Sequence, residues 1–215
     1  TFWVGKRFYR EPDLNMNDWF YFGNTVGNGA GVEDIPLGIG QLAFAQLRQV
    51  NTDQLNNSGS PIRTDVGRPG VTLWDMRLRN IEWQGSNKFD LWTGYAYAPG
   101  GSQTTSPYTA YEKNTGWVLG GKNRFLFNGG NYDFALIYGS GLMQTLELNG
   151  NSLPIENGST QQRASRWRIV NDVSYEIPDT FWAFRAALTH ERWDTGSNQE
   201  PLGTWTSVGI LPVYF

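Results

Sequence analysis

The sequence predicts an all-β protein, and specifically an antiparallel transmembrane β-barrel, on two observations. Apolar and polar residues alternate with a period of two in segment after segment, which indicates strands with two different faces. Short turns alternate along the chain with long polar loops, which is typical of barrels that cross an outer membrane. We therefore treat residues 1–215 as a single barrel domain.

Nine segments carry the alternation, and we expect the strands that they mark to have about 9 to 12 residues each, a length that suits a strand tilted across a bilayer. One face of these segments is aromatic and aliphatic, and the other holds Arg, Asp, Glu or small residues. The expected strands are Phe2–Tyr9, Leu37–Val50, Leu73–Arg79, Phe89–Tyr97, Gly116–Phe127, Tyr132–Tyr138, Trp167–Tyr175, Trp182–Leu188 and Trp205–Phe215.

The connections between these strands fall into two classes. The short ones are rich in Gly, Pro, Asn and Asp, which tolerate turn geometry. They are Gln84–Lys88, Asn128–Asn131 and Ile177–Thr180. The long polar ones are Asn51–Gly70, Pro99–Thr115, Asn149–Gln162 and Asp194–Gly203. The glycine-rich stretch at 27–31 reads as turn and strand glycines.

Composition excludes several classes of function. The chain has 32 aromatic residues, 17% charged residues and a net charge of −3, so it lacks the dense basic surface that nucleic acid requires. It has no cysteine, which removes disulfides, thiolate nucleophiles and cysteine-based zinc sites. His190 is the only histidine, so a multi-histidine metal site and triad catalysis are excluded too. We expect no catalytic residue, no metal and no cofactor.

The opening of the chain mixes charged and aromatic residues densely. Sugars present both hydroxyl groups and an apolar C–H face, so their binding needs flat rings beside charged donors and acceptors. A buried aromatic loop with surface ion pairs would have the same composition. The candidate sugar-binding residues of this stretch are Arg7, Arg10, Glu11, Asp13, Asp18 and Phe20.

Several motifs give the chain a family resemblance. The opening block GKRFY (5–9) is followed by Asp13, Met16, Asp18 and an aromatic cluster, and then by GNGAGVEDI (27–35). WDMRLRNIEW (74–83), KFDLWTGYAYA (88–98), GWVL (116–119) and WTSVGILPVYF (205–215) follow in order. Together these motifs resemble the maltoporin and sucrose-porin family over essentially the whole chain.

The resemblance implies a trimeric, eighteen-stranded barrel in the outer membrane of a Gram-negative bacterium. Its members pass maltose, maltodextrins or related oligosaccharides by facilitated diffusion, without catalysis. The expected partners are therefore an oligosaccharide, outer-membrane lipid and two further copies of the chain. Because only about half of the family's strands are expected here, we expect the chain to be an internal part of such a barrel.

The resemblance also implies a constriction loop at residues 6–24, folded into the pore. Glu11 stands where the family has its constriction arginine, and Phe20 stands where it has a tyrosine. Asp13 and Asp18 match its constriction carboxylates. Tyr132, beside Asn131, is the expected counterpart of an aromatic residue in the stripe that guides the sugar.

Two other interpretations fit the same composition. A soluble carbohydrate-binding β-sandwich is also rich in Trp and Gly, with alternating strands that cover a core. A jelly-roll glycosidase would need a carboxylate pair at a defined separation. Strand length, the asymmetry of the loops and the GKRFY block favour the porin.

Overall fold

The computed structural model describes residues 1–9, 25–49, 71–99, 101–102, 110–111, 113–143, 165–194 and 203–214. Its strands are β1 (Phe2–Tyr9), β2 (Thr25–Pro36), β3 (Gln41–Gln49), β4 (Val71–Trp83), β5 (Asn87–Ala98), β6 (Gly101–Ser102), β7 (Ala110–Tyr111), β8 (Asn114–Phe127), β9 (Gly130–Gly141), β10 (Ser165–Glu176), β11 (Trp182–Asp194) and β12 (Gly203–Tyr214).

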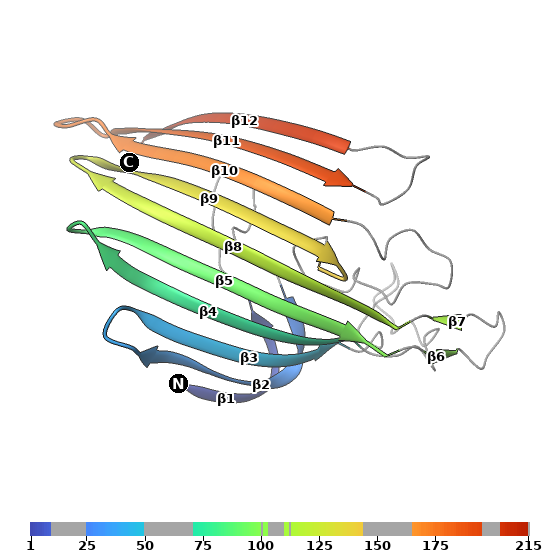
Figure 1. Cartoon of the computed structure of the whole chain (residues 1–215). Helices are drawn as coiled ribbons and strands as arrows, with labels where there is room; N and C mark the ends of the chain where they lie inside the picture. The colour runs from blue at the N-terminus through green and yellow to red at the C-terminus, as the bar shows by residue number, and fades with distance from the viewer. Residues whose placement is uncertain are drawn as a thin grey trace, which may run out of the picture.

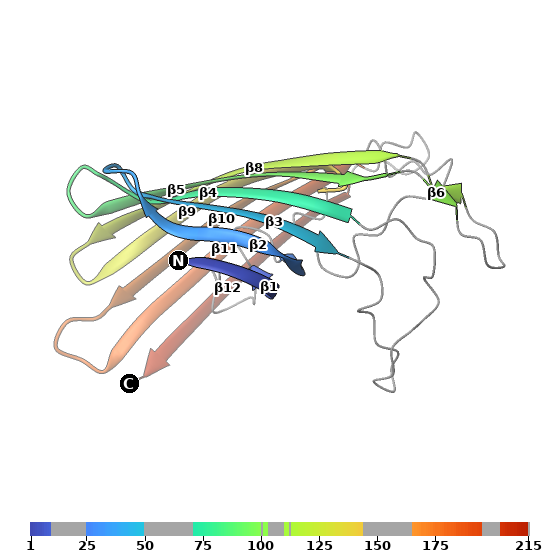
Figure 2. The same cartoon turned by 90° about the horizontal axis from the view of Figure 1, so that it is seen from below.

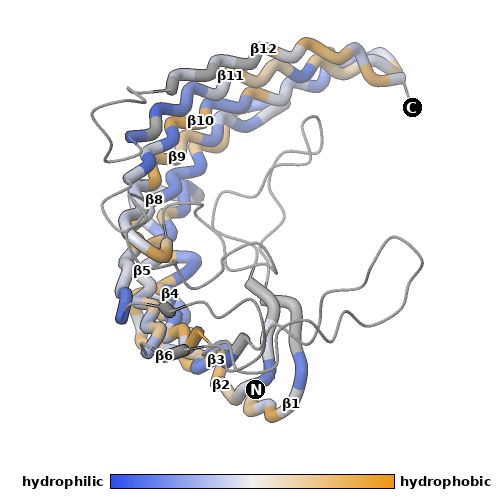
Figure 3. Tube along the Cα trace, turned by 90° about the vertical axis from the view of Figure 1, so that its right-hand side faces the viewer, coloured by the Kyte–Doolittle hydropathy of each residue, from blue (hydrophilic) through white to orange (hydrophobic). Residues whose placement is uncertain are grey.

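Ten of these strands form one antiparallel sheet. Neighbours in the sheet follow the chain, in the order β1-β2-β3-β4-β5-β8-β9-β10-β11-β12, while β6 and β7 pair as a separate ribbon (Figure 1). Seen from below, the long strands lie side by side and tilt across one another (Figure 2). Seen end-on, the sheet bends into an arc with β1 at one end and β12 at the other (Figure 3). The described residues therefore form a curved wall.

Strands follow one another through tight turns at one edge of this wall, on the left of Figure 1. The turns at residues 84–86, 128–129 and 177–181 confirm the three predicted short connections. At Gly129 the backbone has φ +79°, a conformation that residues with a side chain rarely adopt. The strand ends that flank the predicted long connections lie at the other edge of the sheet.

The sequence prediction missed one strand of the ten-stranded sheet and both strands of the short β6–β7 ribbon, and it misplaced the start of another strand. Thr25–Pro36 forms β2, paired with both β1 and β3, although its glycines carry no apolar alternation. The next strand begins at Gln41 rather than Leu37, because residues 37–40 make a further short turn in which the Leu37 N–H donates to the Gly40 carbonyl. Backbone pairing rather than side-chain pattern defines this hairpin.

The two faces of the sheet differ as the alternation predicts. In an antiparallel pair without a bulge, directly opposed residues point to the same side. In β4, for example, Leu73, Asp75 and Arg77 are buried on the inside of the arc, whereas Met76 is exposed on the outside. We call the concave side the inner wall and the other side the convex face.

Two β-bulges lie near the short-turn edge. The register of β2 against β3 shifts between Val32 and Ile35, and that of β4 against β5 shifts between Leu78 and Ile81. Asp34 and Asn80 occupy these shifts with φ values of 58° and 54°. Asx residues tolerate this left-handed conformation, and a bulge adds local twist, which helps the sheet to curve.

The glycines of β2 allow a tryptophan to lie flat on the inner wall. Trp3 of β1 is paired with Gly31 of β2. A Cβ atom on Gly31 would lie 2.8 Å from the Trp3 ring and 2.8 Å from the Phe44 carbonyl oxygen. Glycine is therefore required at position 31 for the ring to pack against the buried residues of the neighbouring strands.

None of the described residues forms a helix long and apolar enough to cross a membrane.

We predict that Gly31→Val lowers the free energy of unfolding by roughly 1–3 kcal/mol, because the added side chain must displace Trp3 or the backbone of β3. Urea titration of the protein folded in lipid vesicles measures this. Gly121→Ala is the matched control, because its Cβ would have its nearest neighbour, a Phe89 ring carbon, at 3.4 Å. Equal stability of both variants would contradict the packing described for Trp3.

Candidate functional site

The inner wall carries most of the ion pairs that the structure defines. They lie on β4, β5, β8, β9, β10 and β11 and join side chains that the register places on the same face. Strand alternation explains why each such strand supplies its charges at every second position. The inner wall is therefore the candidate site, and its parts are described from β4 to β11.

Asp75, Arg77 and Trp92 form a buried cluster in the middle of the wall. Arg77 Nε lies 2.8 Å from Asp75 Oδ1, and Arg77 Nη2 lies 3.2 Å from Oδ2. The Trp92 indole N–H donates to the same Oδ2 at 2.8 Å, and the Arg77 guanidinium lies 5.6 Å from the centre of the Trp92 ring. All three side chains are at most 1% exposed. Such a cluster fixes the wall rather than offering a mobile contact.

A second polar group lies closer to the short turns. Lys122 of β8 lies 3.2 Å from Asp90 of β5, which also accepts a hydrogen bond from the Asn80 backbone N–H at the β4 bulge. On the next strand pair, Arg124 binds both oxygens of Asp133 at 2.7 Å each. These opposed pairs produce alternating positive and negative charge along the wall.

A third group lies on β10 and β11. Glu191 is 1% exposed, and its two carboxylate oxygens are shared between two arginines of the neighbouring strand. Arg166 Nη2 lies 2.6 Å from Oε2, and Arg168 Nε lies 2.7 Å from Oε1. One buried carboxylate thus holds two guanidinium groups of the same strand in place.

Asp172 adds an acceptor between the second and third groups. It lies directly opposite Asp133 in the β9–β10 register. Its Oδ1 atom is buried and, among the described residues, accepts no hydrogen bond. A buried carboxylate oxygen without a donor carries an unmet demand for a hydrogen bond.

The convex face carries two bands of aromatic residues. The band near the long connections, here the loop-end band, contains the ring contacts Trp74–Tyr95 at 5.8 Å, Trp117–Tyr138 at 5.0 Å and Trp167–His190 at 5.3 Å. The turn-end band contains Trp83–Phe125 at 5.8 Å, Phe125–Tyr132 at 5.9 Å, Phe127–Tyr175 at 6.3 Å and Trp182–Tyr214 at 5.0 Å. Exposed aliphatic residues separate the bands, among them Leu91, Leu119, Leu136 and Leu188. Such bands mark the two interfaces of a bilayer.

The structure corrects the placement expected for Tyr132. Tyr132 is paired with Phe125 and Val173 and lies on the convex face, where its hydroxyl donates to Asn171 Oδ1 at 2.6 Å. The neighbouring Asn131 faces the inner wall and donates to Asp133 Oδ2 at 3.3 Å. Successive strand residues point to opposite faces. A shift of one residue is therefore enough to move the expected sugar contact from the inner wall to the convex face.

The expected constriction loop falls largely outside the described residues, and so do Arg10, Glu11, Asp13, Asp18 and Phe20. Its expected beginning at Lys6 is corrected, because residues 6–9 belong to β1 and pair with residues 25–28 of β2. Arg7 is thus a strand residue, with its backbone opposite Gly27.

The alternation in the sequence places Asp75, Arg77 and Arg168 on the polar face, but it did not predict that they belong to the candidate site. Asp75 and Arg77 pair with each other within β4, but Trp92 of β5 and the Arg168 partner Glu191 of β11 come from neighbouring strands, and only the register reveals which residues are opposed. Trp92 was missed for a different reason. The alternation of β5 puts it on the face opposite Leu91 and Tyr95, and a tryptophan among polar residues was the available signal.

The inner wall offers charged and amide groups that can donate and accept hydrogen bonds. Within the described ranges, no group of three or more His, Cys, Asp or Glu side chains is placed to hold a metal ion. The paired charges of the inner wall suit a polar solute that exchanges hydrogen bonds.

We predict that Asp75→Asn destabilises the protein by about 3 kcal/mol, because it removes the charge that neutralises the buried Arg77. Trp92→Phe removes only the indole N–H and keeps a ring beneath Arg77, so its cost should be about 1 kcal/mol. Unfolding in urea from lipid vesicles compares the two. A smaller loss for Asp75→Asn than for Trp92→Phe would show that the ion pair does not hold this part of the wall.

Comparison with known families agrees with this geometry. The sequence matches the family model described as LamB porin over residues 1–215. That family comprises outer-membrane sugar channels, built as β-barrels that cross the membrane with strands. With its continuous antiparallel sheet, polar inner wall and banded convex face, the chain belongs to the LamB porin family.

Proposed function

We propose that the chain forms part of the wall of an outer-membrane pore that passes maltose, maltodextrins or related oligosaccharides by facilitated diffusion. The observation that carries this proposal is the two-faced sheet. Its convex face is apolar between aromatic bands, and its inner wall holds cross-strand ion pairs. Water and sugar would lie on the inner side and lipid on the outer side.

The inner wall would act by exchanging hydrogen bonds. Residues such as Arg124, Asp172 and Arg168 would offer donors and acceptors to successive hydroxyl groups as the sugar moves. Because most of these charges are already paired, each contact with a hydroxyl would be weak. Weak and repeated contacts let a solute enter a pore and leave it again, whereas one strong site would block it.

We further propose that the segment after β1 narrows this pore. Together with Arg7 near the end of β1, Arg10, Glu11, Asp13 and Asp18 would supply polar contacts, and Phe20 would supply a ring for the apolar face of the sugar. The resemblance of residues 5–9 and 27–35 to the sugar porins supports this assignment. Glu11 and Phe20, which replace the family's arginine and tyrosine, would then shape the preference among sugars.

The proposed assembly is a homotrimer, and an asymmetry of the convex face supports it. The loop-end band runs through β4, β5, β8, β9 and β10, but at that level β1, β2 and β3 carry exposed polar residues instead. These are Lys6, Asn28, Gln46 and Arg48. Polar groups facing hydrocarbon are costly, so this part of the convex face would contact protein in the assembly.

The soluble β-sandwich is less well supported. A sandwich needs two sheets packed face to face. The described residues form one ten-stranded sheet and a two-stranded ribbon. Exposed residues such as Leu119 and Leu136 also lie on the face opposite the charges, where a soluble protein would be polar.

Planar-bilayer conductance of the full-length protein tests the proposed function. Malto-oligosaccharides and sucrose are titrated while single-channel current is recorded. Current that closes saturably with sugar is the expected result, and the half-saturating concentrations then rank the substrates. Open channels indifferent to sugar would overturn sugar selectivity, and a folded protein without conductance would overturn the pore itself.

We predict that Asp172→Asn weakens sugar block about two- to tenfold, because a neutral amide oxygen is a poorer acceptor than a carboxylate. The ratio of half-saturating sugar concentrations measures this. Asp179→Asn removes the same charge from an exposed short turn and serves as control. An equal effect of both substitutions would exclude a direct contact between Asp172 and sugar.

We predict that Phe20→Ala weakens sugar block and leaves the open conductance equal or larger, because a ring is removed from the proposed constriction. Current recordings with and without maltotriose separate the two effects. Phe20→Tyr, which keeps the ring, should retain the block. Unchanged sugar affinity in Phe20→Ala would remove Phe20 from the mechanism.

A further inference from the structure

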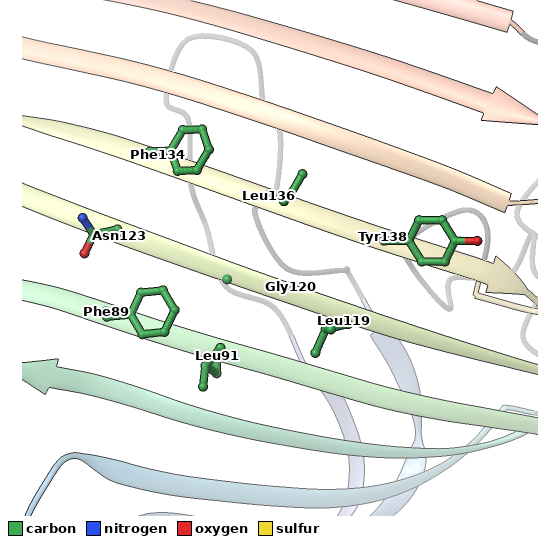
Figure 4. A pocket seen from close by; sticks show the side chains of 9 residues that line it. Phe89, Leu91, Leu119, Gly120, Asn123, Phe134, Leu136 and Tyr138 are labelled. Atoms are coloured by element: carbon green, nitrogen blue, oxygen red, sulfur yellow. The ribbon is translucent and has the colours of Figure 1, made fainter.

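The convex face has a hollow between its two aromatic bands. It has a volume of about 370 Å³ and lies over β5, β8 and β9 (Figure 4). Its lining is almost entirely hydrocarbon, from Phe89, Leu91, Leu119, Gly121, Phe134 and Leu136. The volume falls within the range of about 300–1,000 Å³ that small-molecule sites occupy. We call this hollow the Gly121 groove.

The groove exists because Gly121 interrupts a row of large side chains. Gly121 is paired with Leu91 on one side and Leu136 on the other, and both leucines are exposed on the convex face. The absent side chain leaves a gap between them, and Figure 4 shows the leucines and the rings of Phe89 and Phe134 around it.

The fold itself does not require glycine at this position. A Cβ on Gly121 would meet the Phe89 ring at 3.4 and 3.5 Å and the Asp90 carbonyl oxygen at 3.9 Å, which are ordinary contacts. At Gly31, by contrast, a Cβ would overlap a ring and a backbone carbonyl. The glycine at 121 is therefore best explained by the space it leaves.

The ends of the groove define how a ligand would lie in it. Tyr138 lines the end near the loop-end band. Asn123 lines the end near the turn-end band, where its Oδ1 accepts a hydrogen bond from the Trp83 indole N–H at 2.8 Å. A ligand with a long apolar part and a polar head would place the head beside Asn123 and Trp83 and the apolar part along the leucines.

We propose that the Gly121 groove binds one acyl chain of a phospholipid from the leaflet next to the short turns. The groove is continuous with the lipid-facing surface of a LamB porin, so hydrocarbon surrounds it on every side. Filling the gap restores the dispersion contacts that the missing side chain forgoes. This lipid site is independent of which sugar the pore passes.

Photo-crosslinking to lipid tests this site. The full-length protein is reconstituted in phosphatidylethanolamine that carries a diazirine in mid-chain, illuminated and mapped by peptide mass spectrometry. Adducts should concentrate on residues 119–136, and Gly121→Leu, which fills the groove, should reduce them at least fivefold. Ala186→Leu adds the same side chain to the convex face of β11, away from the groove, and should leave them unchanged.

Folding of each variant is scored first by its heat-modifiable mobility in gels. If Gly121→Leu fails to fold, Gly121→Ala, which makes only ordinary contacts, should still reduce the adducts about twofold. Adducts spread evenly over the convex face, or undiminished in the folded Gly121 variants, would overturn the site. A third outcome is that adducts are absent from β8 and β9 while a photoreactive residue at position 136 crosslinks to a second copy. The groove would then be a protein interface, and this result would also overturn the lipid site.

Discussion

Backbone hydrogen bonding is the constraint on which the rest of this structure depends. In hydrocarbon every N–H and C=O group must be paired within the protein, and a continuous antiparallel ladder satisfies this demand for all strands between the two edges. Once the ladder is set, the register fixes the face of each side chain. The inner charges, the outer bands and the Gly121 groove all follow from the register.

The register also explains how a membrane wall can hold so many charges. Four buried carboxylates of the inner wall each meet a guanidinium or ammonium group on the same or a neighbouring strand, and these are Asp75, Asp90, Asp133 and Glu191. An isolated buried charge would be far more costly than such a pair. In the proposed pore the same pairing would weaken each contact with a passing solute, so the stability of the wall and the release of the solute would have one origin.

Sequence alone predicted the strands with strong alternation, the three turns and the polarity of the two faces, because each of these is a local property. It missed β2, whose glycines allow the β3 backbone and, at Gly31, the Trp3 ring to approach closely, and whose sequence therefore lacks alternation. The sequence prediction also expected Tyr132 rather than Asn131 to contact the sugar, because a shift of one residue exchanges the two faces of a strand. The Asp75–Arg77–Trp92 cluster joins two strands, so no local pattern revealed it.

The central claim is that one face of the sheet meets water and the other meets lipid. The chain has no cysteine, so single cysteines at positions 121 to 126 in β8 give an unambiguous test. A charged, membrane-impermeant thiol reagent should react at 122, 124 and 126, which lie on the inner wall and are not buried, and its rates at 121, 123 and 125 should be at least tenfold lower. Equal rates along the strand, or fast reaction at 121, 123 and 125, would contradict the two-faced wall.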